Sequence, residues 1–161
     1  MENLINKNWI TGSGSQLSLD KVINSLKPEI FKGNSIFIGS DSFIFQKKIS
    51  FVTVVCLLQK SKGGKYFFYK EKIPAKKYPD LLTRISEETR RSIELAEFIK
   101  KSADCDPNLI ELHLDISPEW ASHATSRYSD MLKGYVVGCG YSCKIKPNAW
   151  ASQSVADRHS K

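Results

Sequence analysis

Hydrophobic residues recur along the chain with two different spacings, one typical of strands and the other of helices. Strands are predicted where Val, Ile and aromatic residues are concentrated or alternate with polar ones, at residues 35–41, 49–58, 65–73, 109–116 and 141–146. Helices are predicted where apolar residues lie three and four apart, at residues 18–27, 79–102, 117–138 and 148–159. The predicted order is therefore helix, three strands, helix, strand, helix, strand, helix.

Short turns between the first three strands predict an antiparallel meander, with Gly63-Gly64 as its second turn. The helix at 79–102 leads to the 109–116 strand through a crossover, which places that strand parallel to a neighbour. These elements predict an α/β fold with a mixed five-stranded sheet, three antiparallel strands followed by parallel ones, and helices on both faces. We expect one domain, 1–161, in which the small polar residues of 1–17 form a loose N-terminal arm pinned by Trp9 and Ile10.

Two aspartates each follow an apolar strand segment. Asp41 ends the run that begins at Ser35, and Asp115 ends the run that begins at Leu109. If these strands are parallel neighbours, both carboxylates lie side by side at one edge of the sheet. Such a pair is costly to keep ionised unless a cation separates the charges, and oxygen ligands favour Mg²⁺ or Mn²⁺. The alternative is that each aspartate only shapes a turn or caps a helix.

Two helical acids are candidates to join them. Glu88 lies within the apolar arc of the 79–102 helix, so its side chain is expected to face the sheet. It could instead pair with Arg84 on its own helix. Asp157 lies on the last helix, where the alternative is a solvent-exposed surface acid.

The charge balance favours a polyanionic partner. Lys and Arg number 24 against 17 Asp and Glu, which gives a formal net charge of +7. Residues 60–77 contain seven lysines and a single acid, Glu71, although a solvated hairpin would show the same pattern. The four cysteines lack zinc-ligand spacing, no apolar run is long enough for a membrane span, and a cytoplasmic location is expected.

Other common chemistries find no support in the sequence. There is no nucleophile elbow, phosphate-binding loop or dinucleotide fingerprint. His113, His123 and His159 are candidates for proton transfer, but none is expected to be essential.

Four segments together carry a family resemblance: Ile38-Gly-Ser-Asp41-Ser42, Leu112-His-Leu-Asp115-Ile116, Gly134-Tyr-Val-Val-Gly138, and the stretch from Lys146-Pro147 to Ala156-Asp157. In this order they resemble the YkuK-type family of predicted ribonuclease H-like proteins, over roughly Trp9 to the end. The resemblance implies a ribonuclease H-like fold with acids on the first strand, on the helix after the meander, after the fourth strand and on the last helix. Glu94 fits the helical position about as well as Glu88, and Phe43 departs from the family's pattern, where Gln is expected.

The resemblance also implies a reaction. A two-ion site of Mg²⁺ or Mn²⁺ held by Asp41, Glu88, Asp115 and Asp157 would hydrolyse phosphodiester bonds of RNA, DNA or a hybrid. One ion would generate hydroxide and the other would stabilise the leaving oxygen. Six lysines would contact the phosphate backbone: Lys62, Lys65, Lys70, Lys72, Lys144 and Lys146. Three aromatic residues either stack on bases or belong to the core: Tyr66, Phe68 and Trp150.

Two other functions share these features. The chain could be a non-catalytic module that binds nucleic acid or protein and keeps the same fold, or a purely structural accessory protein. The sequence does not distinguish RNA from DNA and does not predict an oligomeric state.

Overall fold

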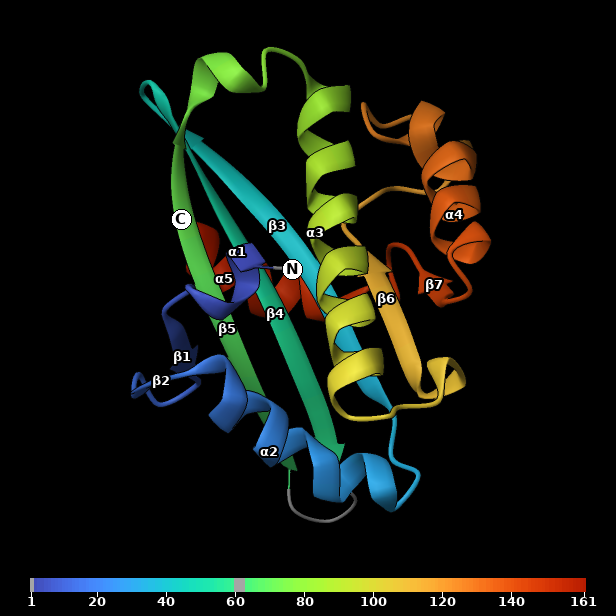
Figure 1. The fold of residues 1–161 in the computed structure, drawn as a ribbon. Coiled ribbons are helices and arrows are strands. Elements are labelled where there is room, and N and C mark those ends of the chain that lie inside the picture. The colour runs from blue at the N-terminus through green and yellow to red at the C-terminus, as the bar shows by residue number, and fades with distance from the viewer. Residues whose placement is uncertain (1, 60–62) are drawn as a thin grey trace.

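The computed structural model describes residues 2–59 and 63–161. The described residues contain a mixed sheet of seven strands in the order β2-β1-β5-β4-β3-β6-β7, with helices on both faces (Figure 1). Its strands are β1 (Trp9–Thr11), β2 (Gln16–Leu17), β3 (Ile36–Phe45), β4 (Lys48–Gln59), β5 (Gly63–Pro74), β6 (Ile110–Leu114) and β7 (Ser142–Lys144). The predicted α/β class, with antiparallel and parallel strands in one sheet, is confirmed, but the prediction of five strands is wrong.

The longer helices are separated by short helical turns. The α-helices are α1 (Glu2–Ile5), α2 (Leu19–Phe31), α3 (Leu81–Ser102), α4 (Ser129–Gly138) and α5 (Asp157–Ser160). A π-helical segment, η5 (Ala151–Ala156), runs directly into α5. The 3-10 turns are η1 (Ala75–Lys77), η2 (Pro107–Leu109), η3 (Glu119–Ala121) and η4 (Ser126–Tyr128). No helix among the described residues is both long and apolar enough to cross a lipid bilayer.

The sheet is built around the expected meander. Strand β4 lies antiparallel between β3 and β5, and β6 lies parallel to β3 on the other side. In the chain, helix α3 connects β5 to β6, and it packs on one face of the sheet, as the crossover predicts (Figure 1). Strand β7 adds a second parallel neighbour to β6.

The N-terminal segment is held by Trp9 and Ile10 as expected, but residues 9–11 and 16–17 form strands, so this part of the segment is not a loose arm. Strand β1 pairs with β5, with Ile10 opposite Phe68, and β2 pairs with β1. Trp9 is fully buried and meets Tyr69 edge to face, with ring centroids 5.0 Å apart. Residues 1–17 are mostly small and polar, which predicts a mobile arm. Pairing with the free edge of β5 and burial of the Trp9 side chain nevertheless fix this segment on the sheet.

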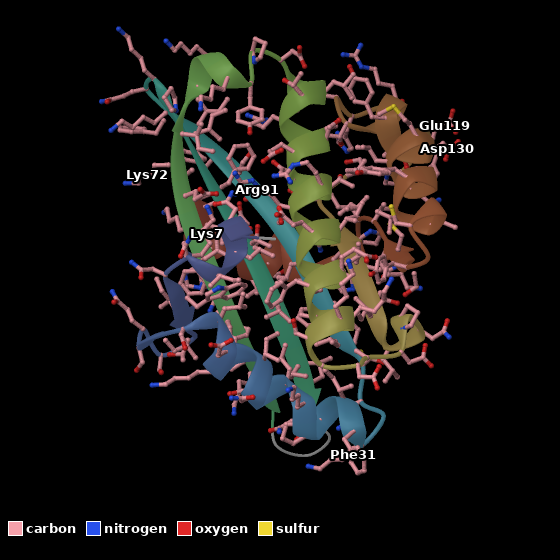
Figure 2. All side chains as sticks on the ribbon, viewed as in Figure 1. Lys7, Phe31, Lys72, Arg91, Glu119 and Asp130 are labelled. Carbon is pink, nitrogen blue, oxygen red and sulfur yellow. The ribbon has the colours of Figure 1, made fainter. Side chains whose placement is uncertain are left out.

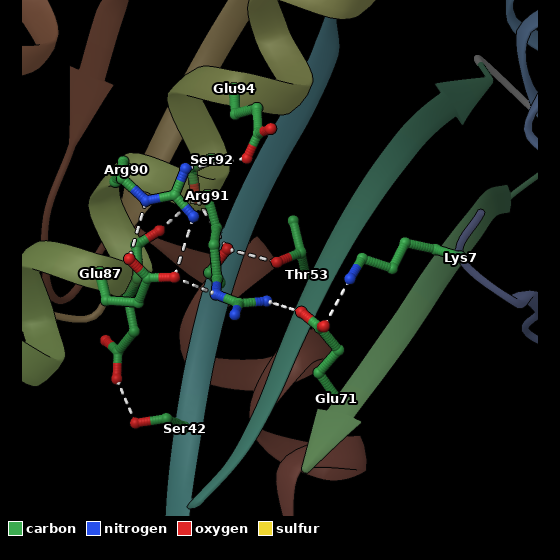
Figure 3. Close-up of polar contacts among 11 residues, drawn as sticks. Lys7, Ser42, Thr53, Glu71, Glu87, Arg90, Arg91, Ser92 and Glu94 are labelled. Atoms are coloured by element: carbon green, nitrogen blue, oxygen red, sulfur yellow. Dashed lines mark hydrogen bonds and ion pairs between the residues drawn. The ribbon is translucent and has the colours of Figure 1, made fainter. Parts of the chain in front are cut away.

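A chain of ion pairs connects this segment to the central helix. Lys7 pairs with Glu71 on β5, Glu71 pairs with Arg91 on α3, and Arg91 pairs with Glu87 one turn earlier (Figure 3). Arg90 also contacts Glu87, at 2.7 Å. Because Arg91 is buried, removal of either of its acidic partners would leave a buried charge poorly compensated.

Two helix boundaries differ from those predicted. The segment expected to be one helix over 117–138 contains η3, η4 and a shorter α4, because Ser122 adopts a left-handed conformation with φ 54° between the two turns. The small polar residues around it compete with the helix for backbone hydrogen bonds. Helix α2 continues through Pro28 to Phe31, where Ile30 joins the core.

The sheet has a separate apolar cluster on each face. Helices α2, α3 and α4 cover the larger cluster, whereas η5 packs on the opposite face against Val52 and Val54. The close approach of η5 depends on Gly39 of β3, since a Cβ atom there would lie 2.6 Å from the backbone nitrogen of Ser152. Gly39 therefore sets the position of the C-terminal helical segment.

We predict that Gly39→Ala destabilises the protein by about 1–3 kcal/mol, because the added methyl group forces η5 away from the sheet. Urea unfolding followed by tryptophan fluorescence measures the effect. Gly134→Ala, in helix α4 with nothing within 4 Å of the added Cβ, is the matched control and should be neutral or stabilising. Equal stability of the two variants would contradict the close packing.

Candidate functional site

The site begins at a notch in the sheet. Strand β6 pairs with β3 from Ile36 opposite Ile110 to Ser40 opposite Leu114, and there β6 ends. Strand β3 does not end at Asp41 as predicted but continues to Phe45, because β4 pairs with it along its whole length. From Asp41 onward, β3 therefore has no partner on the β6 side. The predicted adjacency of Asp41 and Asp115 is confirmed, since each follows the last pair of this ladder.

Asp41 points toward the C-terminal helical segment. Its side chain is on the same face as Gly39, which lies two residues before it. The residue is only 7% exposed, and its Oδ2 accepts a 2.7 Å hydrogen bond from the Ser160 hydroxyl. Burial raises the pKa of Asp41 to about 6, and the negative charges of Asp115 and Asp157 add to this, whereas the Ser160 hydrogen bond opposes it.

Glu88 reaches the notch from the opposite face of the sheet. It lies on α3, is 7% exposed, and accepts a 2.6 Å hydrogen bond from the Ser42 hydroxyl (Figure 3). Burial raises the pKa of Glu88 to about 8, with a further contribution from the charge of Asp41. Glu94 instead pairs with Arg90 on α3, at 3.0 Å. The prediction that Glu88 faces the sheet is confirmed, and it is Glu88 rather than Glu94 that lies beside the aspartates.

The other two acids are more exposed, and each contacts a lysine. Lys146 Nζ lies 2.9 Å from Asp115 Oδ1, an ion pair without hydrogen-bond geometry, so that this buried oxygen accepts no hydrogen bond. Lys161 Nζ donates to Asp157 Oδ2 at 2.9 Å, one turn along α5. Lys146, expected at the phosphate backbone, is thus placed beside an acid of the site.

Four segments far apart in sequence therefore bring their acids into one electrostatic neighbourhood. The donor set consists only of carboxylate and hydroxyl oxygens, which suits Mg²⁺ or Mn²⁺. Two observations also fit a cation: one buried carboxylate oxygen, Asp115 Oδ1, accepts no hydrogen bond among the described residues, and burial together with the negative charge of neighbouring acids raises the pKa values of Asp41 and Glu88. Within the described ranges, however, no three His, Cys, Asp or Glu side chains are close enough to form a metal-ligand group. Ion binding therefore requires these side chains to rotate toward each other.

The remaining candidate lysines lie in different settings. Lys65, Lys72 and Lys144 are exposed. Lys70 donates to the backbone carbonyl oxygens of His159 and Lys161, at 2.7 and 3.2 Å, so it holds the end of α5. The sixth, Lys62, lies outside the described residues.

Two of the candidate histidines have structural contacts. His113 is buried; its Nδ1 accepts a hydrogen bond from the Ala151 backbone at 3.0 Å, and its Nε2 lies 2.9 Å from Glu111. This arrangement makes Nε2 the protonated nitrogen and fixes the start of η5. His159 stacks on Phe68, with ring centroids 4.0 Å apart.

The candidate aromatic residues belong mainly to the apolar cluster under η5. Phe68 is buried there, and Tyr66 and Trp150 pack against it. The alternative of core packing therefore holds for all three.

Sequence reasoning did not identify the two serines that contact the acids. Ser42 could have been found, because alternation along β3 directs it to the face opposite Asp41, where α3 lies. Ser160 gives no comparable signal, since its contact with Asp41 joins residues 119 positions apart. Both hydroxyl groups act as donors that hold the carboxylates in place.

We predict that Asp41 and Glu88 together lower the free energy of unfolding of the metal-free protein as the pH rises from about 4 to 8, against the opposite contribution of His113 and His159, whose pKa values burial lowers. Asp41 and Glu88 bind protons more tightly in the folded state, so the unfolded chain holds fewer protons in this range and unfolding becomes easier. Between about pH 5 and 8, Glu88→Gln should reduce the slope of the free energy of unfolding against pH by up to about 1.4 kcal/mol per pH unit. Urea unfolding in a chelating buffer checks this.

The matched control is Glu94→Gln, which removes a carboxylate from the same helix away from the notch and should keep the wild-type slope. A Glu88→Gln variant whose free energy of unfolding changes with pH as the wild type's does would contradict the electrostatic coupling.

The comparisons with known proteins agree with this architecture. A model of the family described as Ribonuclease H-like matches residues 18–161, which include every acid of the site. Comparisons with curated proteins and with solved structures each give no match. The resemblance read from the sequence motifs is confirmed, and membership of this family indicates a function connected with nucleic acids. The chain belongs to the ribonuclease H-like family.

Proposed function

We propose that this protein is a metal-dependent nuclease that hydrolyses phosphodiester bonds of nucleic acid at the notch. The observation that carries the proposal is the convergence of Asp41, Glu88, Asp115 and Asp157, from both faces of the sheet, around an interruption in the parallel ladder. Burial and the negative charges of neighbouring acids make the ionised forms of Asp41 and Glu88 costly, and a bound cation would relieve that cost. Membership of the ribonuclease H-like family and the net charge of +7 also support a nucleic-acid substrate.

The four acids are proposed to have distinct positions around Mg²⁺ or Mn²⁺. Asp41, on β3 between the two helical acids, would be the shared ligand, and Glu88, Asp115 and Asp157 would flank it. When bound, the ions supply a hydroxide nucleophile and stabilise the leaving oxygen. Ser42 and Ser160 would orient Glu88 and Asp41 through their hydrogen bonds.

Lys146 and Lys161 are proposed to exchange partners when the substrate binds. In the structure described, each ammonium group neutralises one carboxylate at 2.9 Å. A cation at the acids would release both lysines, and their charges would then be free to contact the phosphate groups next to the cleaved bond. Lys65, Lys72 and Lys144 are proposed to extend this contact along the backbone.

One observation favours a second candidate function, a non-catalytic nucleic-acid-binding module. No three acids among the described residues form a ready metal-ligand group, and two of the acids are neutralised by lysines. Such a module would bind nucleic acid equally well with and without divalent ions.

We predict that the wild-type protein binds Mn²⁺ and cleaves nucleic acid only when a divalent ion is present. Asp41→Asn should lower Mn²⁺ affinity and cleavage by more than the roughly 10–100-fold that the loss of an outer-sphere partner costs. Calorimetric titration with Mn²⁺ measures binding, and a gel assay on single-stranded, duplex, hybrid and branched substrates measures cleavage.

Asp130→Asn removes an exposed acid of α4 that does not contribute to the pKa shifts of Asp41 and Glu88, and this matched control should behave as the wild type (Figure 2). Cleavage that persists unchanged in Asp41→Asn would exclude this site. Metal-independent binding without any cleavage would favour the non-catalytic module.

A further inference from the structure

A groove of about 490 Å³ lies at the end of the β3–β4 hairpin. Its lining includes Phe43, Phe45, Lys47, Lys48, Ser50 and Lys72. Phe43 and Phe45 follow Asp41 at alternate positions along β3, so they lie on the same face of the sheet as the Asp41 carboxylate. Phe43, Ser50 and Lys72 are opposite one another on β3, β4 and β5, and together they form one row across this face. The groove therefore begins next to the candidate active site.

The groove combines exposed aromatic rings with positive charge. Phe43 is 37% exposed and Phe45 66% exposed, although both are large apolar side chains. Three lysines surround them, and no acid is among the lining residues. This pairing of flat apolar surface with ammonium groups is typical of sites for single-stranded nucleic acid, where bases stack on rings and lysines contact phosphates.

Ser50 provides an independent indication of a ligand. The residue is 8% exposed, lines the groove, and its hydroxyl has no hydrogen-bond partner within residues 2–59 and 63–161. An unpaired buried hydroxyl costs free energy unless a bound group satisfies it. A base edge or a sugar hydroxyl in the groove would supply that partner.

We propose that this hairpin groove binds an unpaired segment of the nucleic-acid substrate beside the cleavage site. Phe43 and Phe45 stack on bases, and Lys47, Lys48 and Lys72 contact the backbone. The bases must be unpaired, because the base pairs of a duplex stack on each other and leave no exposed face on which a phenylalanine ring could stack. The assignment of this nucleic acid as the substrate depends on the proposed nuclease function.

The spacing along β3 relates the groove to the acids. At about 3.4 Å per residue, Phe43 lies roughly 7 Å from Asp41 and Phe45 roughly 14 Å from it. A nucleic-acid strand advances about 3.4 Å per nucleotide in a stacked helix and further when extended, so these rings meet bases a few nucleotides from the cleaved bond. The groove would therefore direct the cut to a fixed distance from an unpaired segment.

Binding is tested by fluorescence anisotropy with a labelled oligothymidylate and a labelled DNA duplex, in a chelating buffer that prevents cleavage. We expect the single strand to bind more tightly, and Phe45→Ala to weaken this binding roughly 5- to 100-fold. Lys72→Gln should lower the slope of log affinity against log salt by about 0.7, the value for one phosphate contact with a single strand.

The matched controls are Phe31→Ala and Lys27→Gln. Phe31 is 94% exposed at the end of α2, at the opposite end of the molecule from Lys72 (Figure 2), and Lys27 is exposed on the same helix. Both controls should bind as the wild type does. Because Phe45 is largely exposed, its replacement leaves the core intact, and circular dichroism verifies this.

The outcomes separate this proposal from the proposed nuclease function. Single-strand binding that depends on Phe45, in a protein that cleaves nothing, would support the groove and reject the nuclease. Metal-dependent cleavage that is lost in Asp41→Asn, together with binding unaffected by Phe43→Ala and Phe45→Ala, would reject the groove and support the nuclease. A wild-type protein that does not bind the oligothymidylate, or that prefers the duplex, would also overturn the groove.

Discussion

The unequal lengths of two parallel strands determine where the acids of the candidate site can approach one another. Strand β6 stops at Leu114, whereas β3 continues to Phe45 because β4 supports it on the other side. A gap in the ladder lets acids from both faces of the sheet approach one another, which a continuous sheet would prevent. Glu88 and Asp41 lie on opposite faces and still interact electrostatically. The exposed hairpin end, with its groove, results from the same extension of β3.

The acids are held by partners that differ in kind. The two buried carboxyls receive hydrogen bonds from Ser42 and Ser160, and the two more exposed ones receive lysine ammonium groups. Burial makes the ionised forms of Asp41 and Glu88 unfavourable, which is why the pKa values of both rise. Without a cation, the negative charge of the site is therefore compensated in three ways: bound protons, hydrogen bonds from the serine hydroxyls, and ion pairs with the two lysines.

The sequence contained enough information for the central features of the fold and the site. Alternating apolar residues defined the strands, and the crossover rule placed Asp115 beside Asp41. Helical periodicity placed Glu88 toward the sheet. These predictions succeeded because each depends on local pattern and on a general rule of chain connection.

Features that depend on distant contacts were not predictable from pattern alone. The sequence predicts that Trp9 anchors the N-terminal arm, but strand β1 also requires the free edge of β5, which is not visible in the residues of 1–17. Strand β3 continues past Asp41 although Phe43, Ile44 and Phe45 are exposed, because β4 pairs with it there, and the apolar pattern alone does not show where this pairing ends. The contact of Ser160 with Asp41 depends on Gly39, which admits η5 to the sheet.

The central claim is that divalent ions bind at the notch between β3 and β6. Paramagnetic broadening of backbone amide signals by Mn²⁺ in a nuclear magnetic resonance titration tests it most directly, because the broadening reports distance from the ion. The account predicts that signals around Asp41, Asp115 and Asp157 disappear first, while those at the far end of α2, near Phe31, remain. Broadening centred on another part of the molecule, or no localised broadening, would contradict it.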